Sequence, residues 1–178
     1  MKLKECISLA AAILNLDGVL SSSSLTDTDK LLIKCANSCL DEIASEYLPL
    51  KTEKEVVAKN GQIPYSLLGD AIYDVIGVTK DGAKVKYELM PSFIKVDKDG
   101  RYIVRFCTRP PELAPDDDLP LWLHLSPRIV AYGTAAEYLL MTGFYEEAVT
   151  WDGRFKDAMA RAAYGGGEKR IKLRRWLE

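Results

Sequence analysis

The stretch KEVVAKNGQIPYSLL, residues 54–68, decides the fold class, because an Asn-Gly pair separates two segments rich in strand-forming residues. Glycine, with asparagine or aspartate before it, tolerates the positive φ angles that tight hairpin turns require. Two further pairs of this kind follow, Asp81-Gly82 and Asp99-Gly100. Their regular spacing predicts a small antiparallel sheet or sandwich over residues 51–109.

Alternation of apolar and polar residues supports strands in this region. In AKVKYEL, residues 83–89, Val85, Tyr87 and Leu89 alternate with charged residues. This period of two predicts one half-buried strand after the second turn. Pro110-Pro111 then marks the exit from the β region into a loop over residues 110–125.

The residues before this region have the period of helices. A first apolar stripe is formed by Leu3, Ile7, Ala10 or Ala11, and Leu14, and we expect its helix to end near Asp17-Gly18. Thr26 is the expected N-cap of a second helix, with Asp29 at the reciprocal position of a capping box. That helix carries Leu32, Ala36, Cys39 or Leu40, Ile43 and Tyr47 on one face, and Pro49 ends it.

Two more helices are predicted after the β region. Ser126-Pro127 is a strong helix start, and Gly143 is placed to close that helix. The last helix has its apolar face at Tyr145, Ala148, Trp151 or Asp152, Phe155 and Met159. The fold class is therefore α+β, with a helical body of residues 1–50 and 126–164, a β insertion over 51–109, and a tail of residues 165–178. Because each helical half alone would expose its apolar stripe, we expect the two halves to pack together as a bundle.

Composition limits the classes of function. The 178 residues are 48% hydrophobic and 28% charged, with a net charge of -2, which is ordinary globular composition. A dedicated nucleic-acid-binding domain would carry a basic excess. Four scattered cysteines without a CxxC motif indicate reduced thiols in a cytosolic setting. No stretch approaches the roughly 20 apolar residues of a membrane span.

Signals for catalysis or metal binding are weak, and we expect neither an enzyme nor a cofactor. The only histidine, His124, lies among leucines without a nucleophile motif, which favours a structural role. Cys35 and Cys39 lie one helical turn apart, but a zinc site needs further ligands, so two buried thiols are favoured. Residues 116–118 are three aspartates without the alternation and glycine of a calcium loop, which favours a solvated loop.

The C-terminal segment is the strongest candidate for a binding site. Three glycines, Gly165, Gly166 and Gly167, end the last helix and form a hinge. After them, cations alternate with apolar residues; the candidate partner-binding residues are Arg170, Lys172, Leu173, Arg174, Arg175 and Trp176. This pattern is consistent with a peptide hook, whose apolar anchors fill pockets while its arginines pair with carboxylates. It is also consistent with nucleic-acid contact, since cations neutralise phosphates and an indole can stack on a base.

Two segments carry a resemblance to a known family. They are LDEIASEYLPL, residues 40–50, and AYGTAAEYLLMTGFYEEAVTWDGRFKDA, residues 131–158. With the two N-terminal helices and the hairpin-rich insertion, the chain resembles the head-to-tail adaptor proteins of tailed bacteriophages, including the tubular tail A type. These motifs are packing motifs rather than reactive ones.

The resemblance implies a non-enzymatic virion component in the neck between capsid and tail. Such a protein would form a ring, expected to be dodecameric, that docks onto the portal protein and receives the next tail component. It would line the conduit for DNA packaging and ejection, and would be in the host cytoplasm during assembly. By the same likeness, the C-terminal segment reaches the portal. The alternative is a nucleic-acid-binding accessory protein that uses the same basic segment, and a weaker one is a hydrolase built around His124.

Overall fold

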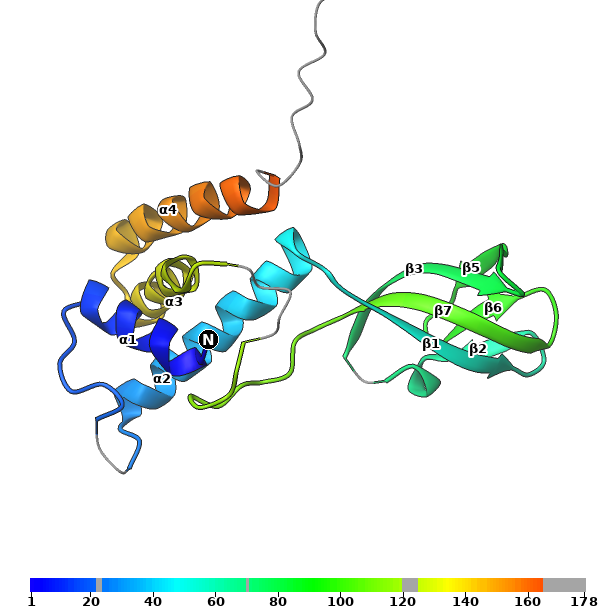
Figure 1. Ribbon diagram of the computed structural model, residues 1–178, viewed down its shortest axis with the longest axis horizontal. Helices are drawn as coiled ribbons and strands as arrows, with labels where there is room; N and C mark the ends of the chain where they lie inside the picture. The colour runs from blue at the N-terminus through cyan, green and yellow to red at the C-terminus, as the bar shows by residue number, and fades with distance from the viewer. Residues whose placement is uncertain (22–23, 70, 120–124, 165–178) are drawn as a thin grey trace, which may run out of the picture.

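The computed structural model describes residues 1–21, 24–69, 71–119 and 125–164. It is an α+β fold, which confirms the predicted class: this part of the chain forms four α-helices and two small antiparallel sheets. The helices gather at one end of the molecule and the strands at the other (Figure 1). The chain passes to the strands along the start of β1 and returns along the end of β7.

The helices share one hydrophobic cluster. Their bounds are α1 (Leu3–Ile13), α2 (Asp27–Glu42), α3 (Pro127–Thr142) and α4 (Tyr145–Tyr164), and a π-helical turn, η1 (Ile43–Tyr47), continues α2. All four helices contribute side chains to the cluster, among them Ile7, Leu40, Val130, Phe155 and Met159. Burial of these side chains supplies the hydrophobic stabilisation of this end of the molecule.

The predicted helix boundaries are confirmed where capping residues determine them. The Thr26 hydroxyl accepts a hydrogen bond from Asp29 N, and the Asp29 carboxylate accepts one from Thr26 N at 2.8 Å, so the capping box is complete. Ser126 caps α3, and Gly143 ends it in the left-handed conformation with φ of 89°. The first helix is shorter than predicted. It ends at Ile13 rather than near Asp17, because Asn15 adopts a positive φ of 54°.

The strands form two sheets. They are β1 (Leu50–Ala58), β2 (Gln62–Pro64), β3 (Ile72–Lys80), β4 (Ala83–Lys84), β5 (Tyr87–Leu89), β6 (Phe93–Val96) and β7 (Gly100–Thr108), with a 3₁₀ turn, η2 (Tyr65–Leu67), after β2. One sheet has the order β1-β7-β3-β4 and the other β2-β6-β5. The long pair β1–β7 runs from Leu50 opposite Thr108 to Ala58 opposite Gly100. A second hydrophobic cluster includes Ile63 and Ile94 of the smaller sheet with Val78, Val104 and Phe106 of the larger one.

Two of the three glycine turns behave as predicted. Asn60 and Gly61 have φ of 54° and 67° and lie between Lys59 and Gln62, which bond to each other. Asp81-Gly82 joins β3 to β4 in the same way, with φ of 49° and 79°. Positive φ at both turn positions is what a two-residue hairpin loop needs.

The third turn and the strand after the second turn differ from the prediction. Strands β6 and β7 lie in different sheets, so Asp99-Gly100 closes no hairpin. The Asp99 carboxylate instead accepts a hydrogen bond from Gly61 N at 2.6 Å and holds the first turn in place. The predicted strand 83–89 is divided between β4 and β5, one in each sheet, and Leu89 is 54% exposed. A two-residue interruption at Val85 and Lys86 lets the chain change sheets while Val85 and Tyr87 still pack on the core.

Candidate functional site

Helix α4 is the element that leads into the predicted docking segment, and the core holds it firmly. Ala148, Phe155 and Met159 are 5%, 1% and 0% exposed. The Phe155 ring meets the Tyr47 ring edge to face, with centroids 6.0 Å apart, which ties α4 to the turn after α2. Three successive turns of α4 are therefore fixed to the helical end of the molecule.

The residues predicted to bind a partner lie outside the described residues. This holds for the hinge, residues 165–167, and for Arg170, Lys172, Leu173, Arg174, Arg175 and Trp176. His124, the candidate for a hydrolase, also lies outside them. These assignments stay predictions.

A group of carboxylates with one cation, Lys156, lies where α2, α3 and α4 meet. Lys156 Nζ pairs with Asp152 Oδ2 at 2.8 Å. Partial burial, followed by the neighbouring charges of Glu46 and Asp152, raises the pKa of Glu42. Partial burial and Asp152 raise the pKa of Glu137. Sequence reasoning missed this group because its members come from elements far apart in the sequence.

A patch of exposed apolar side chains lies at the turn between α3 and α4. We call it the apex patch; it consists of Leu140, Met141, Phe144, Tyr145 and Val149, which are 51%, 63%, 57%, 64% and 71% exposed. The prediction that Tyr145 lies on the buried face of α4 is wrong, since the helix begins at that residue and its core contacts start at Ala148. Five large apolar side chains within ten residues form the kind of patch that marks an interaction site.

A groove runs along the outer side of β1. Its volume is about 1020 Å³, and its lining includes Lys54, Val57, Pro64, Leu67 and Arg101. Val57 and Leu67 are 48% and 44% exposed. Strand β1 is the edge of its sheet, and charged residues along such an edge discourage pairing with other strands.

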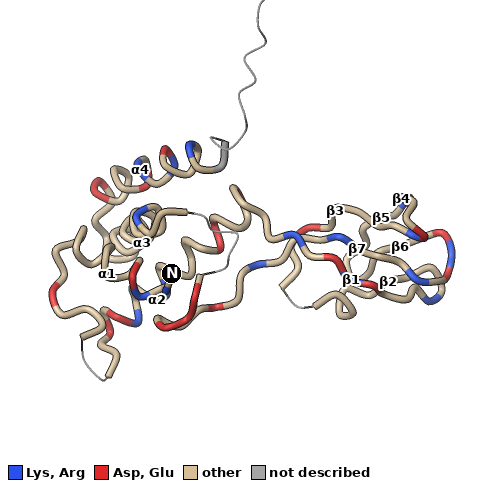
Figure 2. Tube along the Cα trace, viewed as in Figure 1, with Lys and Arg blue, Asp and Glu red and all other residues tan. Residues whose placement is uncertain are grey.

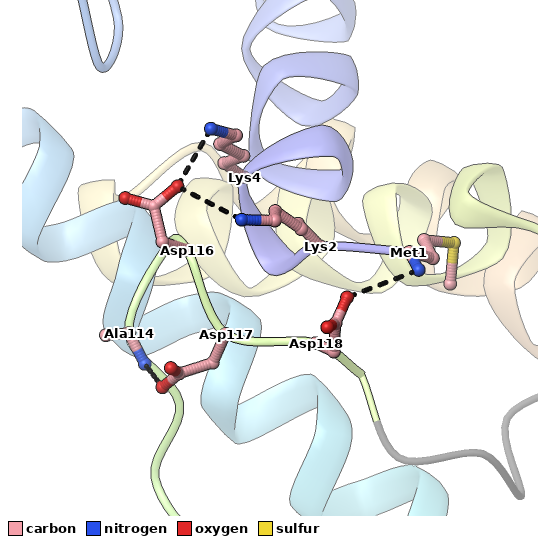
Figure 3. A network of polar contacts seen from close by, with 7 residues as sticks. All are labelled: Met1, Lys2, Lys4, Ala114, Asp116, Asp117 and Asp118. Carbon is pink, nitrogen blue, oxygen red and sulfur yellow. Dashed lines mark hydrogen bonds and ion pairs between the residues drawn. The ribbon is translucent and has the colours of Figure 1, made fainter.

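The acidic loop of residues 116–118 has a structural role. Asp116 pairs with Lys4 at 2.8 Å and with Lys2 at 3.9 Å, and Asp118 lies 3.5 Å from the Met1 amino group (Figure 3). The contact with Lys4 lowers the pKa of Asp116, and the same contact raises the pKa of Lys4.

The backbone of the same loop caps α1. Leu3 N donates to Asp117 O at 3.0 Å, and Lys4 N donates to Pro115 O at 2.8 Å. These carbonyls satisfy amide groups at the start of a helix that has no side-chain cap. The aspartate side chains are exposed, as expected for a solvated loop. The loop is nevertheless bound to the start of α1 by the hydrogen bonds and ion pairs described above.

The cysteines are buried thiols, as the sequence suggests. Cys35 Sγ lies 3.9 Å from Met141 Sδ, and Cys39 Sγ lies 3.7 Å from Val130 O. Burial raises the pKa of Cys35 to about 11 and that of Cys6 to about 12. Within the described residues, no three histidine, cysteine or acidic side chains are grouped so as to hold a metal ion.

Comparisons with known proteins leave the family of the chain open. No protein-family model matches the chain, and no curated protein sequence matches it. Among the described helices, none is long and apolar enough to cross a membrane.

Proposed function

We propose that this chain is a structural head-to-tail adaptor of a tailed-bacteriophage neck and has no enzymatic activity. Copies of it form a ring, dodecameric by the family resemblance, between the portal protein and the next tail component. In this proposal the four helices are one bundle-like body that forms the wall of the ring, and the β insertion projects from it. The C-terminal segment, residues 165–178, docks onto the portal.

The observation that carries the proposal is the placement of α4. Phe155 and Met159 anchor this helix in the core, and in the sequence the glycines of residues 165–167 follow its last residue, Tyr164. Glycine has the greatest backbone freedom of any residue, so it separates the orientation of a terminal segment from that of the helix before it. A rigid helix, a hinge and a segment with both cations and apolar anchors are the parts that a tethered contact needs.

Binding energetics agree with an assembled ring. Ordering the segment costs on the order of 1 to 2 kcal/mol per residue of backbone entropy, which its contacts must offset. Several copies in one ring supply many such contacts at once, and the effective concentration of each is raised by the others already bound. A modest contact per copy therefore gives stable docking.

Charge favours this proposal over nucleic-acid binding. The whole chain has 24 basic and 26 acidic residues, of which five and two lie in residues 165–178. Residues 1–164 are thus left with 19 basic and 24 acidic residues and a net charge of -5. Acidic and basic residues are interspersed along the described trace (Figure 2). The negative excess lies in residues 1–50 and 110–164, which disfavours contact of the helical part with phosphates, whereas residues 51–109 have 11 basic and eight acidic residues.

The direct experiment removes residues 165–178 and measures co-sedimentation with portal rings from the same genome. We expect the shortened chain to remain folded, because side chains within residues 1–164 already form two hydrophobic clusters. We expect it to lose portal binding. Undiminished binding would refute the role of the segment.

A full-length variant provides the matched control. Replacing Leu173 and Trp176 with serine keeps the length and the net charge of the segment but removes apolar anchors, and it should also abolish co-sedimentation. The wild type and this variant are also tested for binding to DNA over a range of salt concentrations. If the variant still binds the portal, and the affinity of the wild type and the variant for DNA falls steeply with salt, the nucleic-acid alternative is the better account.

A further inference from the structure

We infer that copies of this chain join head to tail, with the apex patch of one copy seated in a basic, aromatic hollow on the flank of α3 and α4 of the next copy. The proposed partner is a second copy of this chain. The inference deepens the proposed function, and it rests on that function only in assigning the contact to a neck ring.

The projecting half of the contact is the apex patch. Gly143, in the left-handed conformation, turns the chain within two residues between α3 and α4. Phe144, Tyr145 and Val149 are each more than half exposed at this turn. Glu146 and Glu147 follow on the first turn of α4 and are exposed, so the patch has an acidic border.

The receiving half is a hollow between α3 and α4. Its volume is about 630 Å³, and its lining residues are Ile129, Tyr132, Arg154, Asp157, Ala158, Arg161 and Ala162. At its side, the Tyr132 ring lies 5.4 Å from the Trp151 ring, and the Arg154 guanidinium covers Trp151 at 4.4 Å. Tyrosine, tryptophan and arginine are the residue types that contribute most to the energy of protein interfaces.

With two arginines and one aspartate in its lining, the hollow has an excess positive charge that is complementary to the acidic border of the apex patch. Within the described part of the chain, neither Arg154 nor Arg161 forms an ion pair with a carboxylate. Glu146 and Glu147 are likewise without a cation in that part of the chain. Opposite charges at the border of an interface steer association and fix its register.

The two halves point in different directions, so a copy can fill its hollow only with the apex patch of another copy. Val149 and Arg154 are five residues apart on α4, and at 3.6 residues per turn they are separated by about 140° around the helix axis. One copy therefore cannot seat its own apex patch in its own hollow. When each pair of copies makes this contact once, it is heterologous, and such contacts close into a ring when the rotation permits. Two copies that made it reciprocally would instead form a two-fold dimer, which native mass spectrometry distinguishes from a larger ring.

The test uses the full-length chain in the absence of portal protein. Native mass spectrometry over a concentration series measures self-association of three proteins: the wild type, an apex variant with Phe144→Glu and Val149→Glu, and a hollow variant with Arg154→Glu and Arg161→Glu. All four positions are exposed, so unfolding midpoints should stay close to that of the wild type. We expect self-association of each variant to weaken by about tenfold or more, as removal of interface anchors does.

Mixing the two variants distinguishes the contact between apex patch and hollow from other modes of self-association. The apex variant keeps an intact hollow, and the hollow variant keeps an intact apex patch, so one productive contact remains between them. We expect a one-to-one heterodimer and no larger species. A wild type that stays monomeric over the series, variants that associate as the wild type does, or a mixture without heterodimer would overturn the inference.

The result is separable from the proposed function. If the wild type and variants behave as described but the chain fails to bind portal rings, the lateral contact stands and the portal assignment fails. If the chain binds portal rings and the mixture gives no heterodimer, the portal assignment stands and the lateral contact fails.

Discussion

Gly133 of α3 lies directly against the Sγ of Cys39 of α2. A Cβ at Gly133 would overlap that sulfur and would come within 3.1 Å of the Phe155 ring of α4. Three helices therefore meet at a point where only glycine leaves enough room. Phe155 and Cys39 are 1% and 0% exposed, so neither side chain can move into solvent to make space.

Substituting Gly133→Ala should destabilise the protein. The added methyl group overpacks the core at a typical cost of about 1–3 kcal/mol, which exceeds the helix propensity that alanine gains. The matched control is Gly153→Ala in α4, where a Cβ meets open space, and this change should stabilise by up to about 1 kcal/mol. Urea unfolding followed by circular dichroism measures both changes. A Gly133→Ala protein as stable as the wild type would show that the helices do not meet as described.

The anchoring of α4 predicts different effects for two identical substitutions. Phe155→Ala removes a fully buried ring that packs on Tyr47 and should cost about 3–5 kcal/mol. Phe144→Ala removes a ring that is 57% exposed and should change stability by less than about 0.5 kcal/mol. Equal losses of stability, measured by thermal or urea unfolding at low protein concentration, would contradict the placement of α4.

Asp29 should make stability depend on pH. Its carboxylate accepts hydrogen bonds from Leu20 N, Thr26 N and Thr26 Oγ1, and these bonds lower its pKa. A carboxylate with a lowered folded-state pKa stabilises fully above its unfolded pKa, about 3.9, and this contribution is lost as pH falls through the folded pKa.

The expected result is that Asp29→Asn is less stable than the wild type at neutral pH and that the difference shrinks below about pH 4. The control is Asp27→Asn, in the same helical turn but exposed and paired only with Lys30. Unfolding curves between neutral and acidic pH provide the measurement. A constant difference across that range would mean that the Asp29 bonds do not favour the charged form.

Helix ends and turns that depend only on residues adjacent in the sequence were predicted correctly. The capping box of Thr26 and Asp29, the Ser126 cap and the Gly143 end depend on a few adjacent residues, and each is confirmed. The Asn60-Gly61 and Asp81-Gly82 turns are local in the same sense.

Features that depend on distant residues were wrong or missed. Asp99 binds the Asn60–Gly61 turn rather than closing its own hairpin, because β6 and β7 pair with strands in different sheets. Asp116 and Asp118 fasten to the start of α1, more than one hundred residues earlier in the chain. The exposure of the apex patch depends on where α4 first meets the core, which periodicity alone does not reveal.

The central claim, that residues 165–178 bind the portal rather than this chain's own body, can be tested by site-specific photo-crosslinking. A photoreactive phenylalanine analogue replaces Trp176 in the full-length protein, which is mixed with portal rings, irradiated and analysed by mass spectrometry. The account predicts crosslinks from position 176 to the portal subunit. Crosslinks only to this chain's own residues, or none to the portal although rings and protein co-sediment, would contradict it.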